Sequence, residues 1–330
     1  MDRILFIGDY YPLFSYKSRQ NFNIVEELHK KGHDIILLSK AWCTVNENNF
    51  YGTVQKLSCD YPFYKRYFLD PVQIRNYNID IFNAFLGLGC KVIEREHITQ
   101  IIFADDIIYS PIVELLKKRY NIPCYLFLFW AESFKCMMDD YVWPYMNANL
   151  EAYDQIFTYL PYKETLVKYM NINGNKIRTV CTVSNTLPEN YCYKLPNNIY
   201  LYSEDLNAEH LKRILTDISK KLNYSGAKIY IISASIEDSD TFIFEDNHYK
   251  KLEFKDIPKG AAVLYDYELL VSNPVNFGFI FTCLSCGFYP IINENHLSGL
   301  KELNMSYCKL GNYYVVNDYK KEDVMVGDYI

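Results

Sequence analysis

The sequence predicts an α/β protein, in which short apolar strands alternate with amphipathic helices. The first forty residues already contain a complete strand–helix–strand unit, and the same alternation continues through most of the chain. Half of the residues are hydrophobic, which is typical of a well-buried globular protein. The length of 330 residues is enough for two domains of ordinary size, each with its own core.

The first unit shows the pattern clearly. A strand is predicted over residues 3–7, and an amphipathic helix over residues 21–31. Gly32 follows a last helical turn that contains two lysines, and this combination is typical of a helix end. A second strand over residues 35–39 completes a βαβ unit, whose crossover is expected to be right-handed in a parallel sheet.

The later elements follow the same alternation. Strands are predicted over residues 101–103, 124–129, 155–159, 175–180, 199–202 and 228–234. Helices are predicted over residues 111–120, 147–153, 163–170 and 208–222. The chain from Asn312 onward is expected to form only a brief tail.

Composition excludes several classes of function. A net charge of -6 argues against nucleic acid as a partner, because binding through phosphates needs a basic face. No apolar run approaches the roughly 20 residues that span a bilayer, and the opening residues do not resemble a signal peptide. A cytoplasmic location is therefore expected.

The ten cysteines are scattered and mostly flanked by apolar residues, which predicts reduced, buried thiols. Cys283 and Cys286 have a metal-like spacing, but the chain offers no second ligand pair for them. We interpret these two residues as packing residues, and no cofactor is expected.

The stretch most informative about function is residues 273–303, NPVNFGFIFTCLSCGFYPIINENHLSGLKEL. Phe277–Gly278 precedes an apolar run, Cys286–Gly287 opens into a short strand, and Gly299 and Glu302 follow in a polar loop. A helix that begins at the Phe-Gly pair would direct free N–H groups and the positive end of its dipole at a phosphate. The glycines alone fit equally an ordinary turn–helix–turn–strand of any α/β domain.

The order of these pieces resembles the donor-site signature of retaining nucleotide-sugar glycosyltransferases with the two-domain GT-B fold, family four type. That signature has two Glu residues with seven residues between them, interleaved with Phe-Gly, and it continues with Ala-Cys-Gly-x-Pro-Val-Ile and Gly-x-x-Glu. Here Phe-Gly, Cys-Gly, Pro-Ile-Ile and the final Gly and Glu occur in the same order, with spacings that differ by one residue. The motif is degenerate, because the two Glu positions fall on Val275 or Pro274 and on Thr282 or Cys283.

Two further segments resemble this family. The opening segment matches its pattern at residues 9–12 (Asp-Tyr-Tyr-Pro), 27–28 (Glu-Leu) and 32–34 (Gly-His-Asp), although Ser-Tyr-Lys at residues 15–17 replaces a Gly-Gly pair. Residues 175–186 match a strand that closes the N-terminal domain in the family.

The resemblance implies two Rossmann-like domains that face a central cleft. The acceptor-side domain would cover residues 1–190, and a shortened donor-side domain would cover residues 191–330. The linker is expected at about residues 187–198, where prolines and asparagines cluster.

The resemblance also implies the site residues. Donor-binding residues would be Asn276, Phe277, Gly278, Thr282, Gly287, Glu294, His296 and Gly299. Acceptor-binding residues would be Asp9, Tyr10, Tyr11, Tyr16, Trp130 and Glu132. The catalytic residues would be Asp105, which falls where the family often has a His, and Glu302, the one motif carboxylate that remains. The alternatives are a plain loop role for Asp105 and a helix cap for Glu302.

The function implied is transfer of a hexose from a nucleotide sugar to a carbohydrate, lipid-linked or protein acceptor, with retention and without a metal. Surface polysaccharide or glycoconjugate biosynthesis is the expected context, with peripheral association at the inner membrane face. Asp238 and Asp240 offer an Mg²⁺ or Mn²⁺ alternative, although a solvated acidic loop explains them better.

A second hypothesis from another class stays open. The protein would then be a non-catalytic glycosyltransferase homologue, acting as a partner or acceptor-binding subunit of an active enzyme. The missing Glu pair and the lost Gly-Gly pair favour this hypothesis, and so does the acidic Ser203-Glu204-Asp205, which stands where the family has Gly-Arg.

Overall fold

A computed structural model of the chain describes most of its regular secondary structure. The described residues are 2–8, 16–39, 65–68, 77–104, 110–129, 150–168, 172–180, 198–203, 216, 228–233, 241–244, 247–252, 257–265, 277–294, 297, 301, 305–310 and 313–319. The chain forms two compact units, of which the first comprises residues 1–12, 21–180 and 324–330 and the second comprises residues 13–20 and 181–323. The first unit contains strands β1 to β7 and the second contains β8 to β15.

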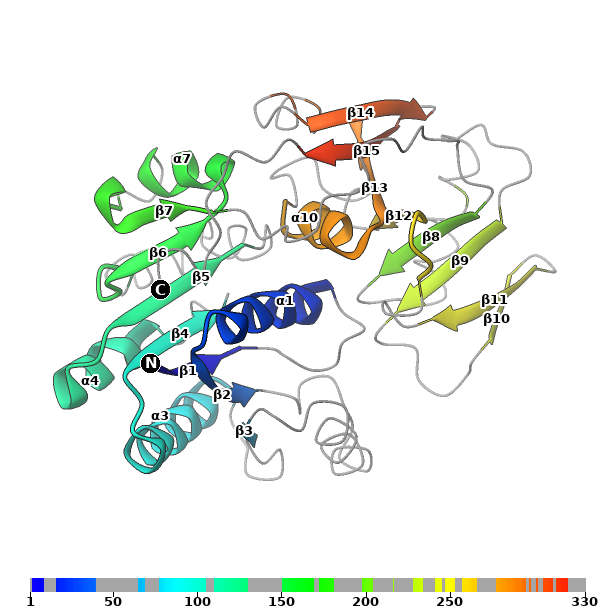
Figure 1. Cartoon of the computed structure of the whole chain (residues 1–330). Helices are drawn as coiled ribbons and strands as arrows, with labels where there is room; N and C mark the ends of the chain where they lie inside the picture. Colours follow the sequence, from blue (N-terminus) through cyan, green and yellow to red (C-terminus); the bar gives the residue numbers. More distant parts are fainter. Residues whose placement is uncertain are drawn as a thin grey trace. The chain divides into compact units, whose positions relative to one another are not determined.

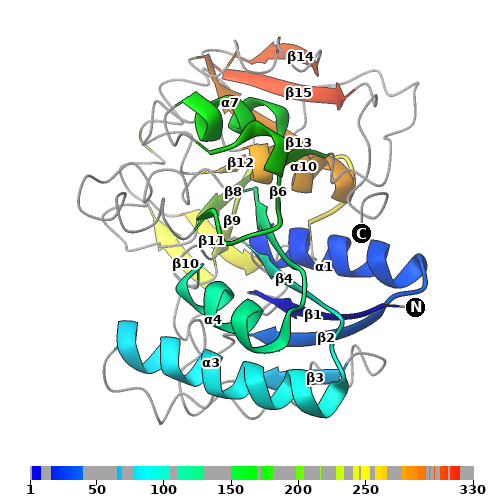
Figure 2. The same ribbon diagram turned by 90° about the vertical axis from the view of Figure 1, so that its left-hand side faces the viewer.

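The first unit is built on a parallel sheet with the strand order β3-β2-β1-β4-β5-β6-β7. Its strands are β1 (Arg3–Ile7), β2 (Asp34–Ser39), β3 (Lys65–Phe68), β4 (Gln100–Ala104), β5 (Cys124–Leu128), β6 (Gln155–Thr158) and β7 (Ile177–Thr179). Its helices are α1 (Tyr16–Lys30), α3 (Tyr77–Glu96), α4 (Ser110–Tyr120) and α7 (Leu160–Lys168), with the 3-10 turn η4 (Gly174–Lys176) before β7. Helix α1 covers one face of the sheet, and α3 and α4 cover the other (Figures 1 and 2).

The core of this unit lies along the central strands. Residues 4–7 of β1 are all buried, as expected for a parallel strand that is covered on both faces. The ring of Phe127 meets Phe6 and Phe157 edge-on, with centroid distances of 6.3 and 5.2 Å. Such aromatic pairs add specific geometry to ordinary apolar burial.

Most of the predicted elements of the first unit are present, with small shifts at their ends. Gly32 adopts a positive φ of 94° after α1, as the helix-end signal predicts. Helix α1 begins at Tyr16, five residues earlier than predicted, because its first turn is polar and gives no apolar period. Helix α3 was not predicted, because Gly87 and Gly89 interrupt its pattern.

The second unit has a mixed sheet with the order β10-β11-β9-β8-β12-β13-β15-β14. Its strands are β8 (Asn198–Ser203), β9 (Lys228–Ser233), β10 (Thr241–Phe244), β11 (Asn247–Leu252), β12 (Ala262–Tyr265), β13 (Tyr289–Asn293), β14 (Met305–Leu310) and β15 (Tyr313–Tyr319). The five strands from β11 to β13 in this order are parallel, and β10, β15 and β14 extend them by antiparallel pairing. Helix α10 (Phe277–Cys286) connects β12 to β13.

The expectation of a brief C-terminal tail is wrong for residues 313–319. This segment is strand β15, which pairs with both β13 and β14, and Tyr313, Val315 and Val316 are buried. Its aromatic and β-branched residues suit a pleated, half-buried surface, which is the signal that the sequence offered.

Thiol burial agrees with the expectation from the cysteine pattern at two positions. Cys124 and Cys283 are buried and unpaired in disulfides. Burial raises the pKa of the Cys124 thiol to about 12, with a smaller contribution from Asp154. Burial also raises the pKa of Cys283 well above its ordinary value. Both thiols therefore stay protonated and unreactive at neutral pH.

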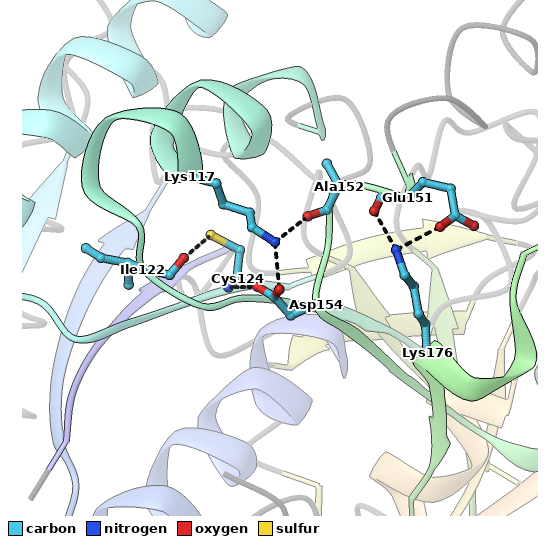
Figure 3. Close-up of polar contacts among 7 residues, drawn as sticks. All are labelled: Lys117, Ile122, Cys124, Glu151, Ala152, Asp154 and Lys176. Atoms are coloured by element: carbon cyan, nitrogen blue, oxygen red, sulfur yellow. Dashed lines mark hydrogen bonds and ion pairs between the residues drawn. The ribbon is translucent and has the colours of Figure 1, made fainter.

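A polar clamp joins the amino ends of β5 and β6 (Figure 3). The Asp154 carboxylate accepts hydrogen bonds from the Cys124 backbone N–H at 2.8 Å and from Lys117 Nζ at 2.6 Å. Lys117 Nζ also donates to the Ala152 carbonyl at 3.0 Å. The Asp154 N–H in turn donates to the Cys124 carbonyl at 2.9 Å. Asp154 therefore ties α4 and the starts of two strands together.

We expect Asp154→Ala to lower the free energy of unfolding by about 1–2 kcal/mol, because it leaves the Cys124 N–H and the Lys117 ammonium without their shared acceptor. Urea-induced unfolding measures this change. Lys118→Ala is the matched control, since Lys118 makes only an exposed contact of 2.6 Å with Glu114 one turn away. Equal losses in the two variants would contradict the clamp.

Candidate functional site

The first sheet has a topological switch point between β1 and β4. The crossover from β1 leads to β2 on one side, and the crossover from β4 leads to β5 on the other side. In open α/β sheets, ligands bind outside the carboxyl ends of the strands at this place, where successive crossovers diverge. Here those ends are marked by Gly8 after β1 and by Ala104 at the end of β4.

Gly8 is required at the switch point by close packing. A Cβ atom on Gly8 would lie 2.8 Å from the Cβ of Ala104, which is closer than carbon atoms pack. It would also lie 3.4 Å from Nδ2 of Asn21 on α1. Asn21 is polar and almost fully buried, so α1 brings one amide group to this end of the sheet.

The predicted acceptor-side residues follow the carboxyl ends of these strands in the sequence. Asp9, Tyr10 and Tyr11 come after β1, Asp105 comes after β4, and Trp130 and Glu132 come after β5. All six lie outside the described residues. Tyr16 is the first residue of α1, and its side chain is likewise outside the description. Their roles stay predictions.

The second sheet has its own switch point, between β8 and β12. Helix α10 connects the parallel neighbours β12 and β13, so it runs back along them and begins at their carboxyl edge. Gly287 ends the helix with a φ of 80°, and its N–H donates to the Leu284 carbonyl at 3.0 Å. The predicted helix start at Phe277 is therefore confirmed, and it places the first-turn backbone N–H groups of the helix at the carboxyl edge next to the switch point.

The side chains of α10 are apolar or weakly polar. Residues 277–284 are all buried, and the helix contains no Asp, Glu, Lys, Arg or His. Thr282 is 1% exposed, and its hydroxyl donates to the Gly278 carbonyl at 2.8 Å. Cys283 is fully buried. Thr282 and Cys283 are the two candidates for the second Glu position of the family motif, so this position is buried in either case.

Among the described residues that were predicted as donor-binding, one carries a carboxylate. Glu294 directly follows β13, is exposed, and accepts a hydrogen bond from the Tyr314 hydroxyl at 3.5 Å. Asn276, His296, Gly299 and Glu302 lie outside the described residues, so their roles stay predictions.

The acidic pair proposed as a metal alternative also lies outside the description. Asp238 and Asp240 fall between the end of β9 and the start of β10. Within the described ranges, no group of three or more His, Cys, Asp or Glu side chains is arranged to hold a metal ion. In the same part of the chain, none of the helices combines the length and apolar character of a membrane span.

Comparison with known proteins bears on the fold. The sequence matches no protein-family model and no curated protein. Among solved structures, Arabidopsis thaliana UGT89C1 complexed with UDP-L-rhamnose is 13% identical with a TM-score of 0.51, over 99% of this chain and 88% of that one. The glycosyltransferase SnogD from Streptomyces nogalater is 10% identical with a TM-score of 0.50, over 91% of this chain and 85% of that one.

The chain has the GT-B fold. The prediction of two Rossmann-like α/β domains is confirmed by this likeness and by the two sheets, each of which has a topological switch point. At 13% identity and below, the likeness shows the fold alone, so it assigns neither the family four type nor any GT-B site residue.

Sequence reasoning missed Tyr314 as a member of the candidate donor side. Tyr314 lies twenty residues after Glu294 in the chain, and their contact depends on the pairing of β15 with β13. The apolar and aromatic run from Tyr313 to Val316 was a signal for a strand, but it carried no information about the strand's partner in this GT-B domain.

We expect Gly8→Ala to lower the free energy of unfolding by about 1–3 kcal/mol, because the added methyl forces β1 and β4 apart at the switch point. Gly87→Ala is the control, since Gly87 is exposed in α3 and a Cβ there meets nothing within 4 Å. The control should be neutral or stabilising by up to about 1 kcal/mol. Chemical denaturation of both variants checks this, and equal stability of the two would contradict the close packing.

Proposed function

We propose that the protein is a glycosyltransferase, which moves a sugar from a nucleotide-sugar donor to a carbohydrate, lipid-linked or protein acceptor. The observation that carries this proposal is that α10 starts at the carboxyl edge of a sheet with a topological switch point, within a GT-B fold. This edge is where α/β sheets bind nucleotides, and the N–H groups and positive dipole end at a helix start suit a phosphate.

Transfer from a nucleotide sugar requires stabilisation of the departing diphosphate. The N–H groups at the start of α10 would supply part of it, because the helix dipole adds positive potential there. In this proposal Glu302 contacts the donor, and Asp105 orients the acceptor hydroxyl or removes its proton. The family four resemblance supports a retaining, metal-independent reaction.

The cellular role follows from the same resemblance. Surface polysaccharide or glycoconjugate biosynthesis would provide the acceptor, and peripheral association with the inner membrane face would give access to a lipid-linked one. A uridine nucleotide sugar is a reasonable first donor to test, because the UGT89C1 structure is a complex with UDP-L-rhamnose.

The second candidate function is a non-catalytic partner or acceptor-binding subunit. The observation that favours it is the character of α10, which has no ionised side chain along its length. The side chains of α10 therefore offer no carboxylate to a ribose and no cation to a diphosphate. Either other elements provide these groups, or the domain does not bind a nucleotide.

Isothermal titration calorimetry of the whole chain with UDP, GDP and related nucleotides separates the two functions. A glycosyltransferase should bind one nucleoside diphosphate, with a Kd roughly between 1 μM and 1 mM, whether or not Mn²⁺ is present. Glu302→Ala should then lower the rate of transfer by at least about tenfold. Failure of every nucleotide to bind would overturn the enzymatic proposal and leave the non-catalytic one.

A further inference from the structure

The register of the second sheet places Tyr314 level with three residues on neighbouring strands, Tyr202, Tyr265 and Ile292. Tyr202 of β8 is paired with Tyr265 of β12, and Ile292 of β13 is paired with Tyr314 of β15. Leu264 and Ile291 are also paired, so Tyr265 and Ile292 stand one residue further on at the same level. Residues paired across neighbouring strands share one face of a sheet.

Helix α10 identifies this face. The ring of Phe279 in α10 stacks on Tyr202 with a centroid distance of 6.0 Å, so the helix covers the face on which Tyr202 lies. Tyr314 belongs to the same row and therefore stands on the same face. Helix α10 begins at the carboxyl edge of β12 and β13, and Glu294 follows β13 at that edge.

The hydroxyl of Tyr314 reaches this carboxylate. It donates to Oε1 of Glu294 at 3.5 Å, while the tyrosine is only 8% exposed and Glu294 is exposed. The Tyr314 ring is supported by Tyr307 of β14, which meets it edge-on at 5.5 Å. A buried, laterally packed ring thus holds a hydroxyl against a carboxylate that is open to a ligand.

We propose that the β14–β15 hairpin positions Glu294 as the carboxylate of the donor site, with Tyr314 as the positioning residue. Glu294 would accept a hydrogen bond from a hydroxyl of the nucleotide-sugar donor, on its ribose or on the transferred sugar. This inference rests on the proposed glycosyltransferase function. The family motif has a Glu at the position of Thr282 or Cys283. In this chain Glu294, which follows the next strand, would take over the role of that carboxylate.

Glu294 is chemically better suited than Thr282 to accept a hydrogen bond from a ligand hydroxyl. An ionised carboxylate is a strong acceptor for sugar hydroxyls, whereas the Thr282 hydroxyl already donates its proton to the Gly278 carbonyl. A carboxylate that is held by one donor loses less rotational freedom when a ligand binds, so the Tyr314 contact reduces the entropic cost of binding. The long distance of 3.5 Å fits a contact that shortens when a ligand fixes the carboxylate.

Titration of nucleoside diphosphates and nucleotide sugars into four forms of the whole chain tests the inference. The forms are wild type, Glu294→Gln, Tyr314→Phe and the double variant. Glu294→Gln should weaken binding about tenfold, because it removes the charge of the acceptor, and Tyr314→Phe about threefold, because it removes the hydroxyl that orients this acceptor. The double variant should bind no more weakly than Glu294→Gln alone, since Tyr314 acts only through Glu294.

Tyr307→Phe is the matched control, because it removes a hydroxyl from the same hairpin and keeps the ring that supports Tyr314. It should bind as wild type does, and all the variants should keep the wild-type Tm without ligand. An effect already present with a nucleoside diphosphate assigns the contact to the ribose, whereas an effect seen only with a nucleotide sugar assigns it to the sugar.

Two outcomes would overturn the inference while the proposed function survives. Nucleotide binding would be as tight in Glu294→Gln or in Tyr314→Phe as in wild type, or the two losses would add in the double variant. If wild type itself binds no nucleotide, the proposed function fails, and the inference fails with it.

Discussion

The right-handed crossover between parallel strands is the constraint on which the rest of the structure depends. It sends the helix after β1 to one face of the first sheet and the helices before and after β4 to the other, so the crossovers diverge at the carboxyl ends of these two strands. Close approach at this place requires Gly8 to have no side chain. The second sheet repeats the arrangement at β8 and β12, where α10 starts at the carboxyl edge.

On the candidate donor side of this GT-B domain, the position at which α10 starts matches the family resemblance, but the side chains of the helix differ from it. The backbone N–H groups in the first turn of α10 point toward the start of the helix, as they do in every α-helix. Its side chains are buried and carry no charge, which makes the helix part of the core. Recognition of a nucleotide sugar would therefore depend on the backbone for its diphosphate and on neighbouring elements for its hydroxyls, for which Glu294 offers a carboxylate among the described residues.

Local sequence patterns were enough to predict the elements whose signals are local. Strand β1, the glycine end of α1 and the helix start at Phe277 each follow from a short run of residues with a definite period or cap. Helix α3 was missed because two glycines weaken its local preference, although packing stabilises it. Strand β15 and its contact through Tyr314 were missed because register between distant strands is a tertiary property. For the same reason, the sequence could predict which residues follow strand ends but not which of them meet.

Amide hydrogen exchange along the second unit, with and without a saturating nucleoside diphosphate, tests most directly whether α10 begins at a nucleotide site. Binding through the helix start should slow exchange at the amides of Phe277, Gly278 and Phe279, which lie in the first turn of α10. Amides of the clamp around Asp154, in the first unit, should keep their rates. Unchanged exchange at the start of α10 under conditions where nucleotide is bound would contradict the account.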